Sequence, residues 1–261
     1  LRDLIVNSKI NKKDLENYLN KRKHKFWYEK YENIYKTFNY AIKLYFGINN
    51  FKPDISSFED GINKYNSQWY EIDYNYRKFS YYFNNSEHKE IVKQLNFLED
   101  AYLNSYLRVL NDKWQNFVKD YSINLSNHQR SFYKTKISPI TSKNQKAFVI
   151  ISDAMRFECG KELSKLISYA NTDNRSFIVK ENYMISSLPS YTQLGMASLL
   201  PNKELEIKST DDTVYADGKS SKGKEARIKI LKNENINSIA FSDEEFLLLN
   251  KSDAKELTKS N

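Results

Sequence analysis

The first part of the chain places apolar and aromatic side chains at the spacing of an α-helix. Between residues 9 and 46 they recur every three or four positions, and a second aromatic block covers residues 62–83. A third apolar stripe covers residues 86–118. Because residues three and four apart share one face of a helix, the pattern predicts a series of amphipathic helices. We therefore expect residues 1–140 to form an all-helical domain.

The hydrophobic pattern changes after residue 146. Ala147–Ile151 is a continuous apolar run, typical of a strand buried on both faces of a parallel sheet, and residues 155–167 then show helical periodicity. Further strand-like and helical segments alternate after them: strands at 177–179, 183–185, 214–218 and 236–241, and helices at 193–200, 222–232 and 244–249. The alternation predicts an α/β domain with a parallel sheet over residues 146–261.

Composition divides the chain at the same place. The 261 residues carry a net charge of +8, and residues 1–145 hold 24 Lys and Arg against 16 Asp and Glu. All three Trp and 16 of the 20 Tyr also precede residue 146. Such a segment can bind nucleic acid, because cations displace counterions from phosphates and aromatic rings stack on bases. The alternative is an AT-rich coding sequence, which over-uses Lys, Asn, Ile and Tyr without any selection for binding.

Cysteine usage and hydropathy predict the compartment. Cys159 is the single cysteine, so there is no internal disulfide framework, which fits a reducing cytoplasm. No apolar run approaches the ~20 residues of a membrane span, and no signal peptide opens the chain. We expect a cytoplasmic protein without a membrane segment. Because the first residue is Leu1 and not Met, we also expect the N-terminus to be cut from a longer chain.

Two residues are candidates for a site. In open α/β sheets ligands bind beyond the carboxyl ends of the strands, where Asp153 would lie. Residues 189–201 predict a helix entry, a short helix and a proline stop, with Thr192 in the first turn. A hydroxyl there meets unpaired N–H groups, which can hold phosphate beside a nucleophile. The alternative is that Ser190 or Thr192 is only an N-cap, and helix chemistry alone favours the cap.

Three stretches resemble signatures of the PglZ family. Residues 150–158, Ile-Ile-Ser-Asp-Ala-Met-Arg-Phe-Glu, resemble its strand-plus-acid motif. Residues 188–201, Leu-Pro-Ser-Tyr-Thr-Gln-Leu-Gly-Met-Ala-Ser-Leu-Leu-Pro, closely resemble its second signature, and residues 217–223 fit a third, looser stretch. The resemblance covers roughly residues 146–250, and the helical region before it is compatible with the family's variable N-terminal part. It implies that residues 146–261 are a PglZ-type α/β domain, C-terminally incomplete.

The resemblance implies a fold of the alkaline phosphatase superfamily and a role among the partner proteins of a BREX bacteriophage-exclusion system. In that superfamily acids and histidines bind a divalent metal pair, often zinc, and a Thr or Ser at a helix start is both metal ligand and nucleophile. Carried over, Asp153 becomes a first-strand metal ligand and Thr192 the ligand and nucleophile, with Ser190 as the less favoured substitute. The resemblance therefore implies a metal-dependent phosphatase or phosphodiesterase.

The chain departs from the family pattern in its histidines. The family's further metal ligands would include histidines, yet none follows His128, and His24, His88 and His128 lack ligand spacing. We therefore expect a fragment truncated at both ends, with half a metal site and no turnover by itself. The alternative is a catalytically inactive α/β scaffold or interaction subunit of the same defence complex. A weaker third hypothesis is direct DNA binding by residues 1–145.

Overall fold

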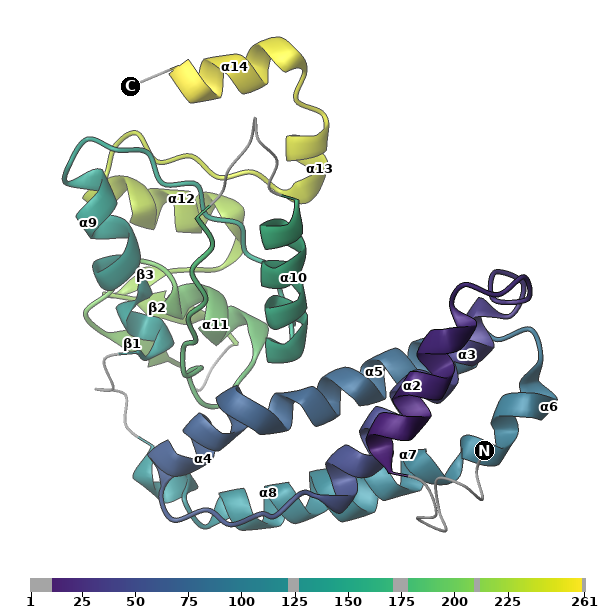
Figure 1. Ribbon diagram of the computed structural model, residues 1–261. Helices are drawn as coiled ribbons and strands as arrows, with labels where there is room; N and C mark the ends of the chain where they lie inside the picture. The colour runs from purple at the N-terminus through teal and green to yellow at the C-terminus, as the bar shows by residue number, and fades with distance from the viewer. Residues whose placement is uncertain (1–10, 122–126, 171–177, 209–211, 260–261) are drawn as a thin grey trace. The chain divides into compact units, whose positions relative to one another are not determined.

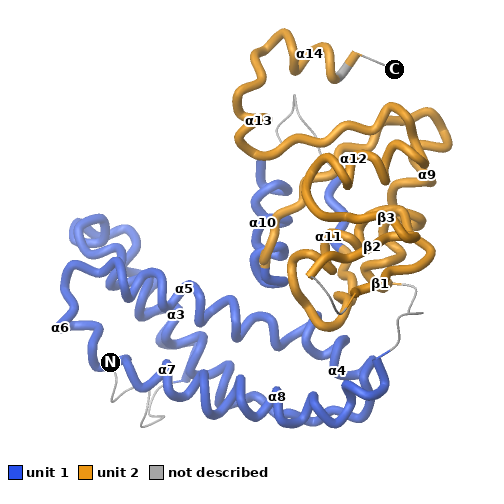
Figure 2. Tube along the Cα trace, turned by 180° about the vertical axis from the view of Figure 1, so that it is seen from behind, with its two compact units in different colours: residues 1–121, 156–181 blue, residues 122–155, 182–261 orange. Residues whose placement is uncertain are grey.

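The chain forms two compact units that interleave along the sequence (Figures 1 and 2). The computed structural model describes residues 11–121, 127–170, 178–208 and 212–259. The helical unit comprises residues 1–121 and 156–181, and the mixed unit comprises residues 122–155 and 182–261. The chain therefore passes from the mixed unit into the helical unit directly after Met155. The predicted domain boundary between residues 140 and 146 stays a prediction.

The helical unit has the predicted periodic helices. They are α2 (Lys12–Arg22), α3 (Glu32–Asn49), α4 (Phe58–Lys64), α5 (Tyr70–Asn84), α6 (Lys89–Val92), α7 (Phe97–Ala101), α8 (Arg108–Gln115) and α10 (Phe157–Tyr169). Short π-helical and 3-10 segments continue or follow them: η1 (Tyr65–Trp69), η2 (Lys93–Leu95), η3 (Tyr102–Leu107) and η4 (Val118–Asp120). Helix α3 packs against α2 and α5, and α10 packs against α5.

The apolar stripes of these helices form one core. Its most deeply buried members include Ala41, Ile42, Leu44, Val92, Leu95, Leu98, Tyr102 and Tyr106. Burial of one large apolar side chain stabilises a fold by about 2 kcal/mol, so the stripes account for the packing of the unit. Within the predicted stripe at 86–118, the buried positions from Val92 to Tyr106 lie three or four residues apart, which confirms the helical interpretation for that part, whereas α8 buries no residue.

The mixed unit combines short helices with a small sheet. Its elements are η5 (Gln129–Ser131), η6 (Tyr133–Ile137), α9 (Ser138–Thr141), α11 (Thr192–Ser198), β1 (Leu205–Ile207), β2 (Val214–Ala216), β3 (Lys219–Ser220), α12 (Gly223–Glu234), α13 (Asp243–Leu247) and α14 (Lys251–Lys259). The strands are antiparallel in the order β1-β2-β3, with Tyr215 opposite both Glu206 and Ser220. Asp217 and Gly218 make the tight turn before β3 at φ 48° and 76°. None of the helices described in either unit has the length and apolar character of a membrane span.

The parallel sheet predicted around Ala147–Ile151 is wrong for the described residues, in which the sheet is antiparallel. The run 147–151 forms no strand, and Phe148 and Ile150 are 72% and 95% exposed. A buried parallel strand takes its hydrogen bonds and its apolar cover from neighbours on both sides. No described segment forms backbone hydrogen bonds with residues 147–151, and Val149 and Ile151 are only partly covered, so the run does not form a strand.

The other predicted strands had different outcomes. The strand end and turn at 214–218 are confirmed by β2 and its turn. Residues 183–185 contribute only one isolated parallel bridge, between Ile185 and His128, and residues 236–241 form no strand. Phe177 lies outside the described residues. Helices and one small sheet together are consistent with the mixed α/β class, but not with the predicted order of strands.

Candidate functional site

The two predicted site residues, Asp153 and Thr192, meet in the mixed unit. Although 39 positions separate them in sequence, Thr192 Oγ1 donates a hydrogen bond of 3.1 Å to Asp153 Oδ2. The second carboxylate oxygen, Oδ1, accepts the backbone N–H of Ala154 at 3.0 Å. Both side chains are exposed, so the pair is accessible from solvent. The contact is observed, and the catalytic and metal-binding roles of the two residues stay predictions.

Asp153 lies in a turn with an unusual backbone conformation. Ala154, which follows it, has a φ of 55°, in the left-handed region. For a residue with a Cβ this conformation costs roughly 1–2 kcal/mol, so it persists only where the surrounding chain holds it. The turn directs the Asp153 carboxylate back onto its own backbone and toward Thr192. Such local strain often occurs at functional sites.

Thr192 is the first residue of α11 and not its cap. The N-cap residue is Tyr191, which makes no side-chain capping bond, and the Thr192 hydroxyl is instead bonded to Asp153. Ser190 precedes the cap, and its hydroxyl makes no hydrogen bond with any described residue. The alternative of a plain N-cap is therefore wrong for both hydroxyls. Helix chemistry alone favoured the N-cap because it considers only neighbouring residues, whereas Asp153, the partner of Thr192, is remote in sequence.

Packing on both sides of α11 holds Thr192 in place. Leu194 and Ala197 are buried against Val214 of β2. Ser198 Oγ, also buried, lies 2.6 Å from Ser187 Oγ in the segment that leads into the helix. The short helix therefore has little freedom to rotate, and its first residue keeps its direction.

Arg227 of α12 is a residue that the sequence interpretation missed. Its Nη2 donates to Gln193 Oε1 at 3.1 Å, and its Nε donates to the Ser221 carbonyl at 3.0 Å. It thus brings a cation to the first turn of α11. Burial lowers the pKa of Arg227. Nothing in the basic stretch 222–232 distinguished this residue from the neighbouring lysines, since burial is not encoded in the charge pattern.

His128 belongs to the frame of the site. It is 1% exposed, and its bridge with Ile185 is flanked by two backbone hydrogen bonds of 2.9 Å. Burial, and then the charge of Arg130, lower the pKa of His128 below its ordinary value. The bridge holds the segment that carries the cis peptide bond Leu188–Pro189 and then enters α11. His128 is therefore a packing residue, as its sequence spacing indicated.

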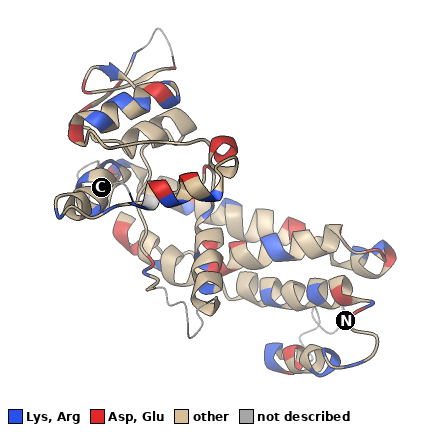
Figure 3. Ribbon diagram, turned by 90° about the horizontal axis from the view of Figure 1, so that it is seen from above, with Lys and Arg blue, Asp and Glu red and all other residues tan. Residues whose placement is uncertain are grey.

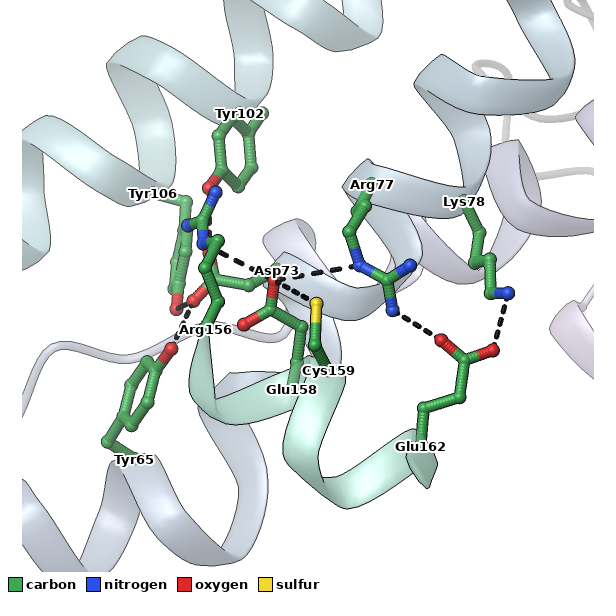
Figure 4. A network of polar contacts seen from close by, with 10 residues as sticks. All are labelled: Tyr65, Asp73, Arg77, Lys78, Tyr102, Tyr106, Arg156, Glu158, Cys159 and Glu162. Atoms are coloured by element: carbon green, nitrogen blue, oxygen red, sulfur yellow. Dashed lines mark hydrogen bonds and ion pairs between the residues drawn. The ribbon is translucent and has the colours of Figure 1, made fainter. Parts of the chain in front are cut away.

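The second half of the strand-plus-acid motif lies in the helical unit (Figure 4). Glu158, in the first turn of α10, has a side chain that is 0% exposed. Its Oε1 lies 3.3 Å from Arg156 Nε and 3.7 Å from Arg77 Nε. The motif therefore crosses from one unit to the other, with Asp153 on one side and Arg156 and Glu158 on the other. The sequence interpretation assigned no role to these two residues.

A second carboxylate, Asp73, lies in the same network (Figure 4). It is 5% exposed and accepts hydrogen bonds from the phenols of Tyr65, at 2.6 Å, and Tyr102, at 2.7 Å. Burial, and then the negative charge of Asp73, raise the pKa of both tyrosines above the ordinary value. The phenols therefore remain neutral donors, and the network supports the packing of the helical unit.

The donor set at Asp153 and Thr192 is incomplete for a metal ion. Carboxylate and hydroxyl oxygens can both bind divalent cations, but a catalytic zinc has three protein ligands in addition to its open position. Across residues 11–121, 127–170, 178–208 and 212–259, no group of three or more His, Cys, Asp or Glu side chains could hold a metal. The described residues therefore do not by themselves fit zinc, and the metal-binding role of Asp153 and Thr192 stays a prediction.

Comparison with known proteins agrees with the resemblance. Residues 132–261 match the family model of the BREX system PglZ alkaline phosphatase-like domain. The chain is 29% identical over 244 residues to the alkaline phosphatase-like protein PglZ of Bacillus cereus (strain H3081.97), covering 90% of this chain and 28% of that protein. It is 32% identical over 259 residues to the alkaline phosphatase-like protein BrxZ of Escherichia coli O9:H4 (strain HS), covering 92% and 29%. The chain therefore spans less than a third of the length of these relatives. No solved structure matches it.

Proposed function

Because residues 132–261 belong to the PglZ family, we propose that this chain carries the nucleophile of a metal-dependent phosphatase or phosphodiesterase. The observation that supports this proposal is the hydrogen bond of 3.1 Å from Thr192 Oγ1 to Asp153 Oδ2. The proposal includes work within a BREX bacteriophage-defence system, with other BREX proteins as partners, because the matching family model is described as a domain of that system. It also includes a divalent metal, zinc being the first candidate, whose further ligands lie beyond the described residues.

The chemistry of the chain's own residues begins with the Thr192 hydroxyl. Its proton points to Asp153, so the remaining lone pairs of the oxygen are directed away from the carboxylate and toward solvent. A nucleophile needs this arrangement, in which a base orients the hydroxyl and leaves its oxygen accessible. Attack on phosphorus would form the bond to Thr192 Oγ1 and break the phosphorus–oxygen bond to the leaving alkoxide, which takes up the proton that the hydroxyl gave up. Water would then attack the phosphothreonine, break the Oγ1–phosphorus bond and return a proton to Thr192 Oγ1. Asp153 would hold the hydroxyl proton through one carboxylate oxygen, and its remaining lone pairs could serve the metal-ligand role that the resemblance implies for it.

The test is a hydrolysis assay on a protein that carries this sequence at the length of its curated relatives. A chromogenic phosphodiester is supplied with zinc and, separately, after chelation. We expect Thr192→Ala to lower kcat by about a thousandfold or more, because loss of a nucleophile removes the covalent route. Asp153→Ala should also lose activity, and Thr192→Ser should keep a measurable part of it. Ser190→Ala is the matched control and should behave as the unchanged protein.

The inactive scaffold remains the second candidate, and one observation favours it. Part of the family motif is structural here, because Glu158 is buried between two arginines of the helical unit. A plaque assay with the complete defence system separates the two functions. Full protection by Thr192→Ala and Asp153→Ala would support the scaffold, whereas loss of protection together with loss of hydrolysis supports the enzyme. Equal hydrolysis rates for the variants and the unchanged protein would refute the roles of both residues.

A further inference from the structure

The end of α2 and the loop that follows it concentrate positive charge. Residues 21–30 read Lys-Arg-Lys-His-Lys-Phe-Trp-Tyr-Glu-Lys, with five Lys and Arg, coloured blue in Figure 3, against the single acid Glu29. Every residue from 21 to 30 except Tyr28 is exposed. No carboxylate of a described residue lies within 4.0 Å of these five cations. Charge that is not paired within the protein is available to a polyanion.

The same loop exposes two large aromatic rings. Phe26 is 86% exposed and Trp27 is 53% exposed, although most aromatic residues of the helical unit are buried or partly buried in its core. The rings meet edge to face, with centroids 5.1 Å apart at 82°. Lys30 Nζ lies 5.6 Å from the centroid of the Trp27 ring. Exposed rings beside cations are the arrangement on which nucleic-acid bases stack.

An aromatic groove continues from the loop along α2 and α3. It has a volume of about 360 Å³, and its walls include the rings of Tyr18, Tyr31 and Tyr35. Arg22, the last residue of α2, belongs both to residues 21–30 and to the groove, and its Nη2 donates to the Tyr18 hydroxyl at 2.7 Å. The guanidinium carbon lies 5.0 Å from the centroid of the Tyr18 ring. The cation is thus held beside the aromatic wall of the groove and remains exposed, so a phosphate can reach it.

We propose that residues 21–30 and this groove bind single-stranded nucleic acid. The cations match the phosphate backbone, and the exposed rings match unpaired bases, whose faces a duplex hides within its own stack. An acidic protein segment would satisfy the charges but would give the Phe26 and Trp27 rings no flat partner. The proposal goes beyond the proposed function, because it concerns only the helical unit and uses neither Asp153 nor Thr192.

The experiment measures fluorescence anisotropy of a labelled oligothymidine of about 20 nucleotides, longer than a typical single-strand site, titrated with the intact chain. We expect affinity to fall as salt rises. Trp27→Ala should weaken binding about tenfold, the effect of one lost stacking contact. Changing Lys21, Arg22 and Lys23 together to Ala should reduce the slope of log affinity against log salt by about two, near 0.7 for each lost phosphate contact. All four positions are exposed, so the variants should keep the unfolding transition of the unchanged chain.

Matched controls remove similar groups elsewhere. Tyr169→Ala removes a ring that is 84% exposed on α10, and Lys229→Ala with Lys232→Ala removes two exposed cations from α12. These variants, and Asp153→Ala, should bind as the unchanged chain does. If Asp153→Ala did not lower hydrolysis, the proposed function would fail, but the result on nucleic-acid binding by residues 21–30 would not change.

Four outcomes would overturn the proposal. The first is absence of binding at low salt, and the second is an equal loss of affinity in the loop variants and the matched controls. The third is equal affinity for a duplex of the same length together with no effect of Trp27→Ala, which would indicate charge alone. The fourth is displacement of the oligonucleotide by polyglutamate at equal charge concentration, which would indicate a surface for an acidic protein.

Discussion

Asp73 of the helical unit and Asp153 of the mixed unit are carboxylates in opposite settings. Asp73 is 5% exposed and accepts a hydrogen bond on each oxygen, one from the buried phenol of Tyr102 and one from the partly buried phenol of Tyr65. Asp153 is exposed, with one side-chain partner, Thr192, and its own turn backbone. A carboxylate whose acceptor positions are filled from within the protein stabilises the fold. A carboxylate with open acceptor positions and a hydroxyl beside it can bind a ligand at little cost in stability.

The largest effect should come from removing the buried carboxylate. Asp73→Ala leaves the phenols of Tyr65 and Tyr102 without their acceptor. Each unsatisfied buried donor costs about 1–3 kcal/mol, so we expect the free energy of unfolding to fall by about 3 kcal/mol. Urea denaturation followed by tryptophan fluorescence measures it, because all three Trp lie in the helical unit.

Asp153→Ala is the matched control for that measurement. Its side chain is exposed, so the free energy of unfolding should change by less than about 0.5 kcal/mol. Equal losses for the two variants would show that the contrast between the carboxylates is wrong.

A smaller effect should appear in the mixed unit as the pH falls. Burial, and then the charge of Arg130, hold the pKa of His128 below its ordinary value of about 6.5. The unfolded chain therefore binds the proton more readily, so stability is complete above about pH 6.5 and is lost as the pH falls toward the folded pKa. We measure the free energy of unfolding by urea denaturation followed by circular dichroism. It should be about 1 kcal/mol lower at about pH 5.5 than at about pH 7.5. An unchanged pH dependence in His128→Gln would contradict this origin.

The smallest effect should come from a partly exposed ion pair in the helical unit. Glu162 pairs with Lys78 and with Arg77, the latter at 2.6 Å. Burial raises the pKa of Glu162, but hydrogen bonds from Lys78 and Arg77 outweigh it, so the pKa lies below the ordinary value. A lowered carboxyl pKa gives stability that is present above about pH 4.3 and is lost as the pH falls through the folded pKa.

As the pH falls, protonation of Glu162 should lower the free energy of unfolding by at most about 1 kcal/mol, because solvent screens the ion pairs with Lys78 and Arg77. Tryptophan fluorescence during urea denaturation, at about pH 6 and about pH 3.5, measures it. Glu162→Gln should show a smaller difference between the two pH values than the unchanged chain. The same difference in both would place the acid sensitivity elsewhere. Together with the His128 measurement, this result would show that the two units lose stability in different pH ranges. The mixed unit would lose it below about pH 6.5 and the helical unit below about pH 4.3.

The helices of the first 140 residues could be predicted because their signal is local. A helix hydrogen-bonds to itself, so the spacing of apolar residues in α3 or α5 already defines its buried face. The run 147–151 was predicted wrongly because a strand depends on partners elsewhere in the chain. Thr192 and Asp153 were paired through motif order, while local helix chemistry favoured a cap that the structure does not contain.

Sequence alone was enough for the helical stripes, the acid and hydroxyl of the candidate site, and the basic, aromatic character of residues 1–145. The tertiary structure decided that Asp73 is buried and Asp153 exposed, and that Glu158 lies in the helical unit although Asp153 does not. The physical reason is that charge and periodicity belong to the chain itself. Burial and hydrogen-bond partners depend on which distant segments come together, and no local pattern specifies them.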